Sequence, residues 1–283
     1  MSRRNQSVTP LRWQSQMLLA LVIVPVTAAV AVEGIFFAPG SPWLPVRALG
    51  LGAVLPLMVW KSRAATPGAA LCGGLYAATL LLVGPGWRTP FWPLFALLML
   101  TLGATRFGRV HKEALGLAEA RHGRNAAQVT ANLGIAALAA VALRFSLSLA
   151  TPAILNTRAL RLALAAALAE AAADTLSSEL GEVLGGEPRM LTTFRRVPAG
   201  TDGAISLAGT LAGVTAAVVI AAVAVFALGL TLGQAALVIL AAVAGLFVDS
   251  LLGALLERRG WLNNDAVNFL STFVAALLAY WMG

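Results

Sequence analysis

Long apolar runs dominate the sequence, and they constrain the fold more than any other feature. The runs are about 15 to 25 residues long, the length of a helix that crosses the hydrocarbon core of a bilayer. Hydrophobic residues make up 59% of the 283 residues and charged residues only 11%, against about 25% in a typical soluble domain. A soluble fold is therefore excluded, and the single cysteine excludes a disulfide scaffold. The prediction is an all-α, polytopic transmembrane helical bundle.

Cutting the runs at proline, glycine and charge clusters predicts nine spans. They cover residues 16–37, 43–60, 68–84, 90–105, 126–147, 159–182, 204–231, 234–256 and 266–282. With a cytoplasmic N-terminus, most of the 20 Lys and Arg residues fall in inner loops, as the positive-inside rule requires. This placement explains the net charge of +8, so no nucleic-acid partner is expected. The expected location is the cytoplasmic membrane of a prokaryote.

The first span contains a short motif that allows two interpretations. Ala29-Val30-Ala31 fits a signal-peptide cleavage site, although the apolar stretch is long for a signal peptide. The span is therefore either a retained helix or a segment that is removed.

Acidic residues divide the chain into two parts. The first 105 residues contain one acid, Glu33, and are predicted to be a scaffold or a channel for a lipid tail. Residues 106–283 hold the remaining acids and are predicted to be a catalytic membrane domain with its site at the cytoplasmic face. The basic stretch from Arg106 to Arg124 is interpreted as an interfacial helix on anionic lipid.

Three acids within the predicted spans are the candidate catalytic and metal-binding residues: Asp174, Glu179 and Asp249. A carboxylate deep in hydrocarbon costs at least about 2.5 kcal/mol unless it is paired or solvated. Gly245 and Gly253 lie four residues on either side of Asp249 and allow a neighbouring helix to approach it. Together the three acids are predicted to bind Mg²⁺, which uses one or two carboxylates plus substrate phosphates. The alternative is ion pairing with arginine for packing alone, for example between Glu170 and Arg144, Arg158 or Arg161.

The longest inner loop is predicted to bind phosphate groups. Arg195 and Arg196 offer bidentate hydrogen bonds, and Gly200 and Gly203 permit close backbone approach. Thr201 or the adjacent Asp202 is expected to cap the following helix. The alternative interpretation is an ordinary basic cytoplasmic loop.

Amide side chains near the same predicted face complete the candidate site. Asn132, Asn264 and Asn268 are expected to orient phosphates, although amides in membranes also serve simply to bond helices together. The sequence lacks a G-x-x-x-x-G-K-[ST] loop, an H-E-x-x-H motif and a G-x-S-x-G motif. These absences disfavour a P-loop nucleotide site, a zinc protease and a hydrolase of the nucleophile-elbow type.

Five blocks between about residues 106 and 272 resemble the integral-membrane family of the plant chloroplast phytyl-phosphate kinase and its bacterial, archaeal and animal relatives. The blocks are Arg124-Asn-Ala-Ala-Gln128-Val-Thr-Ala-Asn132, Ala173-Asp174-Thr-Leu-Ser-Ser178-Glu179-Leu-Gly181, Thr192-Thr193-Phe-Arg195-Arg196-Val-Pro198-Ala-Gly200-Thr201-Asp-Gly203-Ala-Ile-Ser206-Leu-Ala-Gly209, Asp249-Ser250-Leu-Leu-Gly253 and Asn264-Asp-Ala-Val-Asn268-Phe. Two departures are Leu176, where an aromatic residue is common, and Arg195-Arg196, where lysine often occurs. The family is more distantly similar to CTP-dependent polyprenol and dolichol kinases and to phosphatidate cytidylyltransferases.

The resemblance implies a nucleoside-triphosphate site at the cytoplasmic ends of the helices. The resulting hypothesis is a kinase that converts a prenyl monophosphate, such as phytyl phosphate, to its diphosphate, with CTP or another nucleoside triphosphate as donor and Mg²⁺ as cofactor. Its expected partners are the prenyl phosphate, the nucleotide and membrane lipid, with the oligomeric state left open. Two alternatives are a secondary transporter of a lipid or an anion, and a cytidylyltransferase that forms a CDP-lipid.

Overall fold

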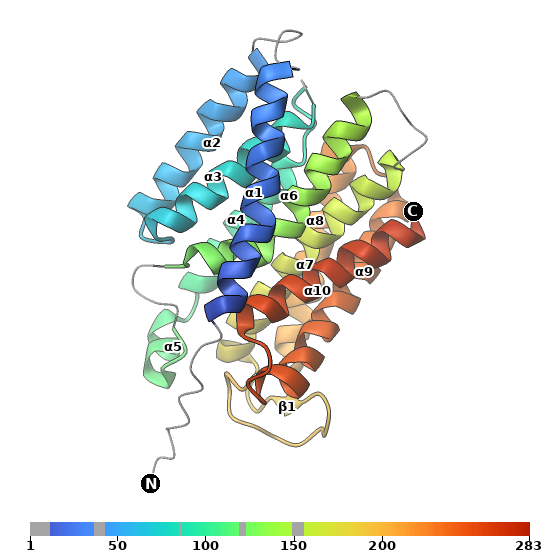
Figure 1. Cartoon of the computed structure of the whole chain (residues 1–283). Coiled ribbons are helices and arrows are strands. Elements are labelled where there is room, and N and C mark those ends of the chain that lie inside the picture. The colour runs from blue at the N-terminus through green and yellow to red at the C-terminus, as the bar shows by residue number, and fades with distance from the viewer. Residues whose placement is uncertain (1–11, 37–42, 85, 119–122, 149–155) are drawn as a thin grey trace.

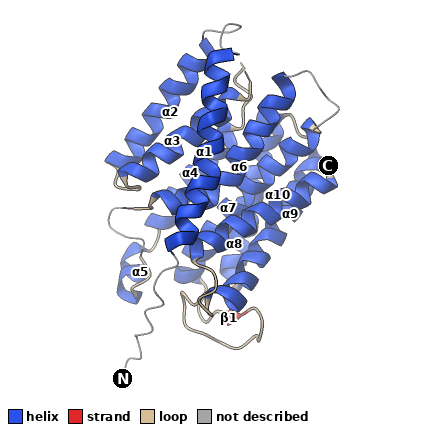
Figure 2. Ribbon diagram, viewed as in Figure 1, coloured by secondary structure: helices blue, strands red, loops and turns tan. Residues whose placement is uncertain are grey.

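The chain is almost entirely helical (Figures 1 and 2). The computed structural model describes residues 12–36, 43–84, 86–118, 123–148 and 156–283. Within these ranges the α-helices are α1 (Arg12–Phe36), α2 (Trp43–Lys61), α3 (Pro67–Leu82), α4 (Phe91–Arg106), α5 (Arg109–Leu115), α6 (Ala126–Ser148), α7 (Thr157–Leu184), α8 (Leu207–Leu228), α9 (Leu232–Leu252) and α10 (Asn264–Met282). A π-helical turn, Gly253–Glu257, extends α9, and β1 (Arg189–Met190) pairs antiparallel with β2 (Ala204–Ile205).

Each of the nine predicted segments corresponds to one long helix, from α1 to α4 and from α6 to α10. Five of the described helices are long and apolar enough to cross a membrane, or six if α4 and α5, which meet at a bend of 62°, form one span. The protein is therefore a membrane protein with several apolar helices, while nine spans and a cytoplasmic N-terminus stay predictions. The basic residues before Arg12 lie outside the described part of the chain.

The predicted interfacial helix differs from the structure. Helix α5 is short, and Lys112 turns inward with only 1% of its surface exposed, although a helix on lipid headgroups would present its cations to the interface. The small β1–β2 pair also departs from a purely helical fold.

Helix α7 is the centre of the bundle. It packs against α4, α6, α8, α9 and α10, and its alanine-rich middle is buried on all sides. Glycines on the neighbouring helices allow this close packing, because a Cβ atom added at Gly213 of α8 would lie 2.8 Å from the Ala173 carbonyl oxygen. A Cβ atom added at Gly245 of α9 would lie 2.6 Å from Glu170 Cγ. Small residues thus bring two acid-bearing helices, α7 and α9, into direct contact.

The first helices pack onto the rest of the bundle. Helix α3 contacts α6, and α4 contacts both α7 and α8. The Tyr76 hydroxyl hydrogen-bonds with Thr130 Oγ1 at 2.8 Å, and Glu33 forms an ion pair with Arg144. Arg144 is therefore engaged by α1, and the alternative in which it pairs with Glu170 is wrong. Within the described residues, both Glu170 carboxylate oxygens are buried without a hydrogen-bond partner.

One end of the bundle collects polar helix ends. Helix α8 begins there with Ser206 Oγ accepting from Gly209 N at 3.1 Å, and α10 begins with Asn263 Oδ1 accepting from Ala266 N at 2.9 Å. Gln14, near the start of α1, donates to the Trp261 carbonyl oxygen at 2.9 Å, which fixes the start of α1 at this end as well. Figure 1 shows α5 and β1 at the same end. The predicted helix cap at Thr201 or Asp202 is wrong, because α8 begins only after the short strand β2.

Candidate functional site

A polar cavity of about 440 Å³ opens at this end of the bundle, among α6, α7, α9, α10 and the loop before β2. We call it the polar cavity. Most of the predicted site residues line it: Asn132, Asp174, Glu179, Gly200, Thr201, Gly203, Asp249, Asn264 and Asn268. They come from five separate segments of the chain, so the fold gathers residues that are more than a hundred positions apart.

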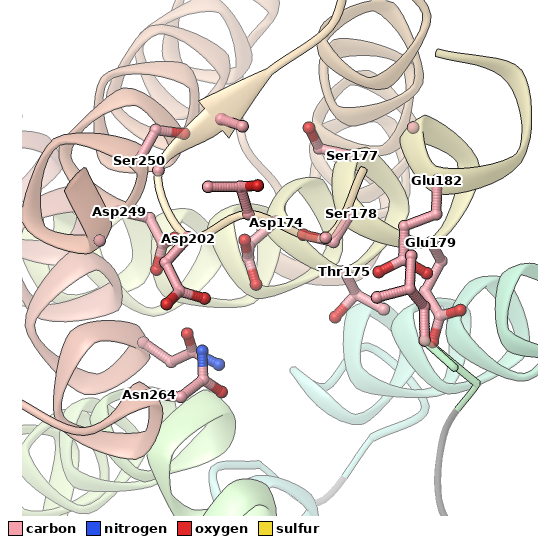
Figure 3. Close-up of a pocket in the computed structure, with 18 of the residues that line it drawn as sticks. Asp174, Thr175, Ser177, Ser178, Glu179, Glu182, Asp202, Asp249, Ser250 and Asn264 are labelled. Carbon is pink, nitrogen blue, oxygen red and sulfur yellow. The ribbon is translucent and has the colours of Figure 1, made fainter. Parts of the chain in front are cut away.

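The deepest acids of the polar cavity lie on two different helices. Asp174 of α7 and Asp249 of α9 are close enough to interact electrostatically, as are Asp249 and Asp202 of the loop. Figure 3 shows the side chains of these three aspartates around one space, with Asn264 nearby. Burial raises the pKa of Asp202, and the Arg258 guanidinium opposes this rise. The arrangement places carboxylate oxygens from three elements in one small volume.

Asp249 is oriented by polar side chains of α10. Ser271 Oγ donates to Asp249 Oδ2 at 3.3 Å. With its amide turned so that the nitrogen donates, Asn268 reaches the same oxygen at 3.2 Å and the Asn264 carbonyl oxygen at 3.3 Å. Asn268 therefore hydrogen-bonds to the Asp249 carboxylate, whereas the sequence predicted that it orients phosphates directly.

Glu179 is engaged by a buried lysine. Its Oε2 is 2.5 Å from Lys112 Nζ, and its Oε1 accepts from Thr105 Oγ1 at 2.9 Å. Both carboxylate oxygens are thus used in joining α7 to α4 and α5. This geometry differs from the predicted role of Glu179 as a metal ligand beside Asp174 and Asp249. Within the described ranges, no three acidic, histidine or cysteine side chains come together as a metal site.

The arginine of the polar cavity is Arg124, which precedes α6. Its Nη2 donates to Thr175 Oγ1 at 3.5 Å, and its charge lies close enough to Asp174 to stabilise the carboxylate. Its position is fixed by the backbone, because Arg124 N donates to the Ala64 carbonyl oxygen at 3.1 Å and its own carbonyl accepts from Thr66 N at 3.0 Å. A cation is thereby held beside the acids.

The glycine loop wraps over the end of α9. Gly203 has φ +73°, and an added Cβ would lie 2.3 Å from Ala254 N and 2.5 Å from the Ser250 carbonyl oxygen. Gly200 has φ +75°, and an added Cβ would lie 2.2 Å from Leu117 Cδ2. Only glycine fits both the backbone conformation and the space at these two positions. The two glycines therefore let the loop pack closely on the end of α9 and on Leu117 at the rim of the polar cavity, and its phosphate-binding role stays a prediction.

Arg195 and Arg196 lie outside the lining of the polar cavity, in contrast to their predicted phosphate-binding role. The segment folds back on itself, with Met190 N donating to the Arg195 carbonyl oxygen at 2.9 Å. Both side chains are exposed, and Arg196 Nη1 lies 2.6 Å from Glu187 Oε2. The physical reason is this local backbone pairing, which turns the two guanidinium groups toward solvent.

Five charged residues at or next to this site were not among the predicted site residues: Lys112, Arg124, Glu182, Asp202 and Glu257. Arg124, Gln128 and Asn132 recur every four residues, so helical spacing alone placed Arg124 on the face that carries the predicted Asn132. Lys112 carried no such signal, because its position depends on the sharp bend between α4 and α5.

Comparisons with known proteins identify the family of the chain. The model of the family described as integral membrane protein DUF92 matches residues 50–276. Protein VTE6, chloroplastic, of Arabidopsis thaliana is 33% identical over 262 residues, which cover 90% of this chain and 71% of that protein. An uncharacterized membrane protein of Synechocystis sp. is 35% identical over 69% of this chain and 73% of its own length.

A third relative, an uncharacterized membrane protein of Methanocaldococcus jannaschii, is 43% identical over 118 residues, which cover 39% of this chain and 46% of that protein. No solved structure matches the chain. The family match covers most of the sequence, including every residue that lines the polar cavity. The chain is therefore a member of the integral membrane protein family DUF92.

Proposed function

We propose that the protein is a kinase that transfers the γ-phosphoryl group of a nucleoside triphosphate, with CTP the expected donor, to a prenyl monophosphate such as phytyl phosphate. The observation that carries the proposal is the polar cavity, whose lining brings Asp174 and Asp249 together with Arg124 and a glycine loop at the end of an apolar bundle. The likeness to VTE6 and the resemblance to the phytyl-phosphate kinase family support the choice of a lipid phosphate acceptor. The proposed location is the cytoplasmic face of a prokaryotic membrane.

The charge of the polar cavity calls for a cation together with an anionic nucleotide. Asp174, Asp202, Asp249, Glu182 and Glu257 all line it, so a triphosphate alone would meet strong repulsion. Mg²⁺ typically uses one or two carboxylates and completes its shell with phosphate oxygens and water. Asp174 and Asp249 suit that donor set and would hold the ion, which would supply charge neutralisation to the phosphates.

The residues of the chain would then act mainly by positioning. The acceptor phosphate oxygen forms a bond to the γ-phosphorus while the bond from that phosphorus to the β–γ bridging oxygen breaks, releasing the nucleoside diphosphate. The acceptor is already an anion, so no general base is needed to activate it. Arg124 would stabilise charge on the transferred group, and the backbone N–H groups of the loop around Gly200 and Gly203 would bind donor phosphates.

Product analysis tests the proposal. Purified protein is incubated with phytyl or geranylgeranyl monophosphate, Mg²⁺ and CTP labelled in the γ-phosphate. The expected products are a labelled prenyl diphosphate and unlabelled CDP. Release of pyrophosphate with formation of a CDP-lipid would instead identify a cytidylyltransferase, and lipid flux across proteoliposomes without nucleotide consumption would identify a transporter.

A further inference from the structure

A second cavity, of about 140 Å³, lies among the end of α2, α4 and α6, and we call it the arginine cavity. Its walls are largely apolar and include Val59, Leu97, Leu98, Leu102, Val129 and Leu133. Four arginines also line it: Arg63, Arg106, Arg109 and Arg124. No acidic residue is among the described residues of its lining. The arginine cavity thus combines hydrocarbon with four arginines, although Arg109 also pairs with Glu113 outside it and Arg124 lies near Asp174. The polar cavity, in contrast, is rich in acids.

Backbone structure fixes the positions of two of these arginines, Arg124 and Arg63. Ala65 and Arg124 form a parallel bridge, and Gly123, with φ +73°, packs so tightly on this segment that an added Cβ would lie 2.1 Å from the Ala64 carbonyl carbon. Arg63 adopts a left-handed conformation with φ 57°, which is unfavourable for a residue with a side chain. Such strain persists only where the surrounding structure enforces it, and it often marks a functional site.

A buried hydroxyl in the wall lacks a partner. Thr101 of α4 is 8% exposed, lines the arginine cavity, and its Oγ1 makes no hydrogen bond within the described residues. A helical threonine commonly satisfies its hydroxyl on the carbonyl group one turn earlier, and Thr101 does not. A buried hydroxyl without a partner is costly, so its presence here points to a polar atom supplied by a ligand.

The two cavities share part of their lining. Arg124 and Asn132 belong to both, and Arg124 also lies near Asp174. A phosphate bound by the arginines would therefore lie next to the donor phosphates in the polar cavity. This adjacency is the arrangement that direct phosphoryl transfer between two bound substrates requires.

We propose that the arginine cavity is the acceptor site, which binds the phosphate group and the first carbons of a lipid monophosphate. This inference rests on the proposed kinase function. Its charge is complementary to a phosphate monoester, and its apolar walls suit a hydrocarbon chain. Sites that enclose a whole small ligand measure about 300 to 1,000 Å³, so a cavity of 140 Å³ holds only the head of a long-chain lipid. The remaining tail extends outside it.

Binding measured without nucleotide tests the inference. The full-length protein in detergent is titrated with geranylgeranyl monophosphate, and the dissociation constant is determined by native mass spectrometry. Leu98→Trp fills the arginine cavity and is expected to weaken binding at least about tenfold. The matched control is Met99→Trp, which adds the same ring one position along α4 on an exposed side chain that does not line the cavity. It is expected to change binding less than about twofold.

A second pair of variants, each of which removes one cation, tests the same inference if Leu98→Trp does not fold. Arg106→Gln removes an exposed cation that lines the arginine cavity, and Lys61→Gln removes an exposed cation that does not. The first is expected to weaken binding about tenfold and the second less than about twofold, because a charge-assisted hydrogen bond to phosphate is lost only in the first. Equal effects within either matched pair would overturn the inference.

Further measurements identify the chemistry of the ligand and distinguish failure of the acceptor site from failure of the kinase function. Geranylgeraniol and inorganic phosphate are each expected to compete poorly, and equal competition by inorganic phosphate would reduce the site to an anion site and overturn the lipid assignment. If CTP turnover persists while Leu98→Trp and Met99→Trp behave alike, the acceptor site is wrong and the kinase proposal stands. If lipid phosphate binds in the arginine cavity as expected but no phosphoryl transfer occurs with any nucleotide, the kinase proposal fails and the binding site stands.

Discussion

The ammonium group of Lys112 lies 2.5 Å from Glu179 Oε2, in a position where the lysine side chain is almost completely buried. The same nitrogen donates to the carbonyl oxygens of Ala104 and Thr105, at 3.0 and 3.1 Å. These carbonyls lie in the last turn of α4, so one side chain joins α4 and α5 to α7. The wall of the polar cavity near Glu179 is therefore held by a buried ion pair.

Loss of this lysine is expected to destabilise the protein. Lys112→Met leaves the Glu179 carboxylate partly buried without its cation, and breaking a buried pair in this way costs about 3 to 5 kcal/mol. Arg109→Met is the control, since Arg109 forms an exposed ion pair with Glu113 at 3.0 Å whose loss costs about 0.5 kcal/mol or less. Thermal unfolding in detergent measures both, and equal changes would show that the Lys112 pair carries no special stability.

The dependence of activity on Mg²⁺ distinguishes Asp249, a proposed metal ligand, from Glu179, which is paired with Lys112. Asp249→Asn removes a proposed ligand and is expected to raise the Mg²⁺ concentration for half-maximal activity about tenfold or more. Glu179→Gln is expected to change it less than about threefold, because the Glu179 carboxylate is already engaged by Lys112 and Thr105. Titration of purified variants with MgCl₂ checks this, and a larger shift for Glu179→Gln would favour the metal role predicted from the sequence.

Arg124 and Arg196 are expected to differ in their importance for activity. Arg124→Gln is expected to lower kcat/KM by about 10- to 100-fold, since a charge-assisted hydrogen bond to phosphate contributes about 1.5 to 3 kcal/mol. Arg196→Gln is expected to change it less than about twofold, because Arg196 is exposed and paired with Glu187. Steady-state kinetics with a prenyl monophosphate acceptor measures both. The reverse order would place the phosphates over the β1–β2 loop.

Two glycines provide a test of the loop. Gly203→Ala and Gly186→Ala share a positive φ, +73° and +60°, and therefore a strain of about 1 to 2 kcal/mol. Only at Gly203 would the new methyl group meet the backbone of α9, since nothing lies within 4 Å of a Cβ at Gly186. Gly203→Ala is expected to raise the KM for the nucleotide about tenfold beyond the effect of Gly186→Ala. Similar KM values for the two variants would argue against a nucleotide-binding loop.

The helices were predictable because the hydrophobic pattern alone determines them. All nine segments follow from runs of apolar residues, and Asp174 and Asp249 stand out because a carboxylate in such a run requires a special environment. Their convergence also follows from the sequence, since Gly245 and Gly253 allow helices to approach on the side of Asp249.

The details of the loops were less predictable because they depend on contacts between distant segments. Arg195 was expected to bind phosphate from its residue type, yet a backbone hydrogen bond from Met190 turns its segment away from the polar cavity. Lys112 was expected at the lipid surface, and the bend between α4 and α5 carries it inward. The arginine cavity was not predicted at all, because it arises where the α2–α3 turn pairs with the segment before α6.

The proposed roles of the two deep aspartates are tested by the rate of phosphoryl transfer from γ-labelled CTP to phytyl monophosphate in Asp174→Asn and Asp249→Asn. Both variants nearly preserve side-chain volume and remove one carboxylate, so kcat is expected to fall at least about 100-fold while the unfolding temperatures stay close to that of the unmodified protein. Glu187→Gln, which changes an exposed acid outside both cavities, is the matched control and should retain full activity. Unchanged turnover in Asp174→Asn and Asp249→Asn would show that the two carboxylates have no part in phosphoryl transfer.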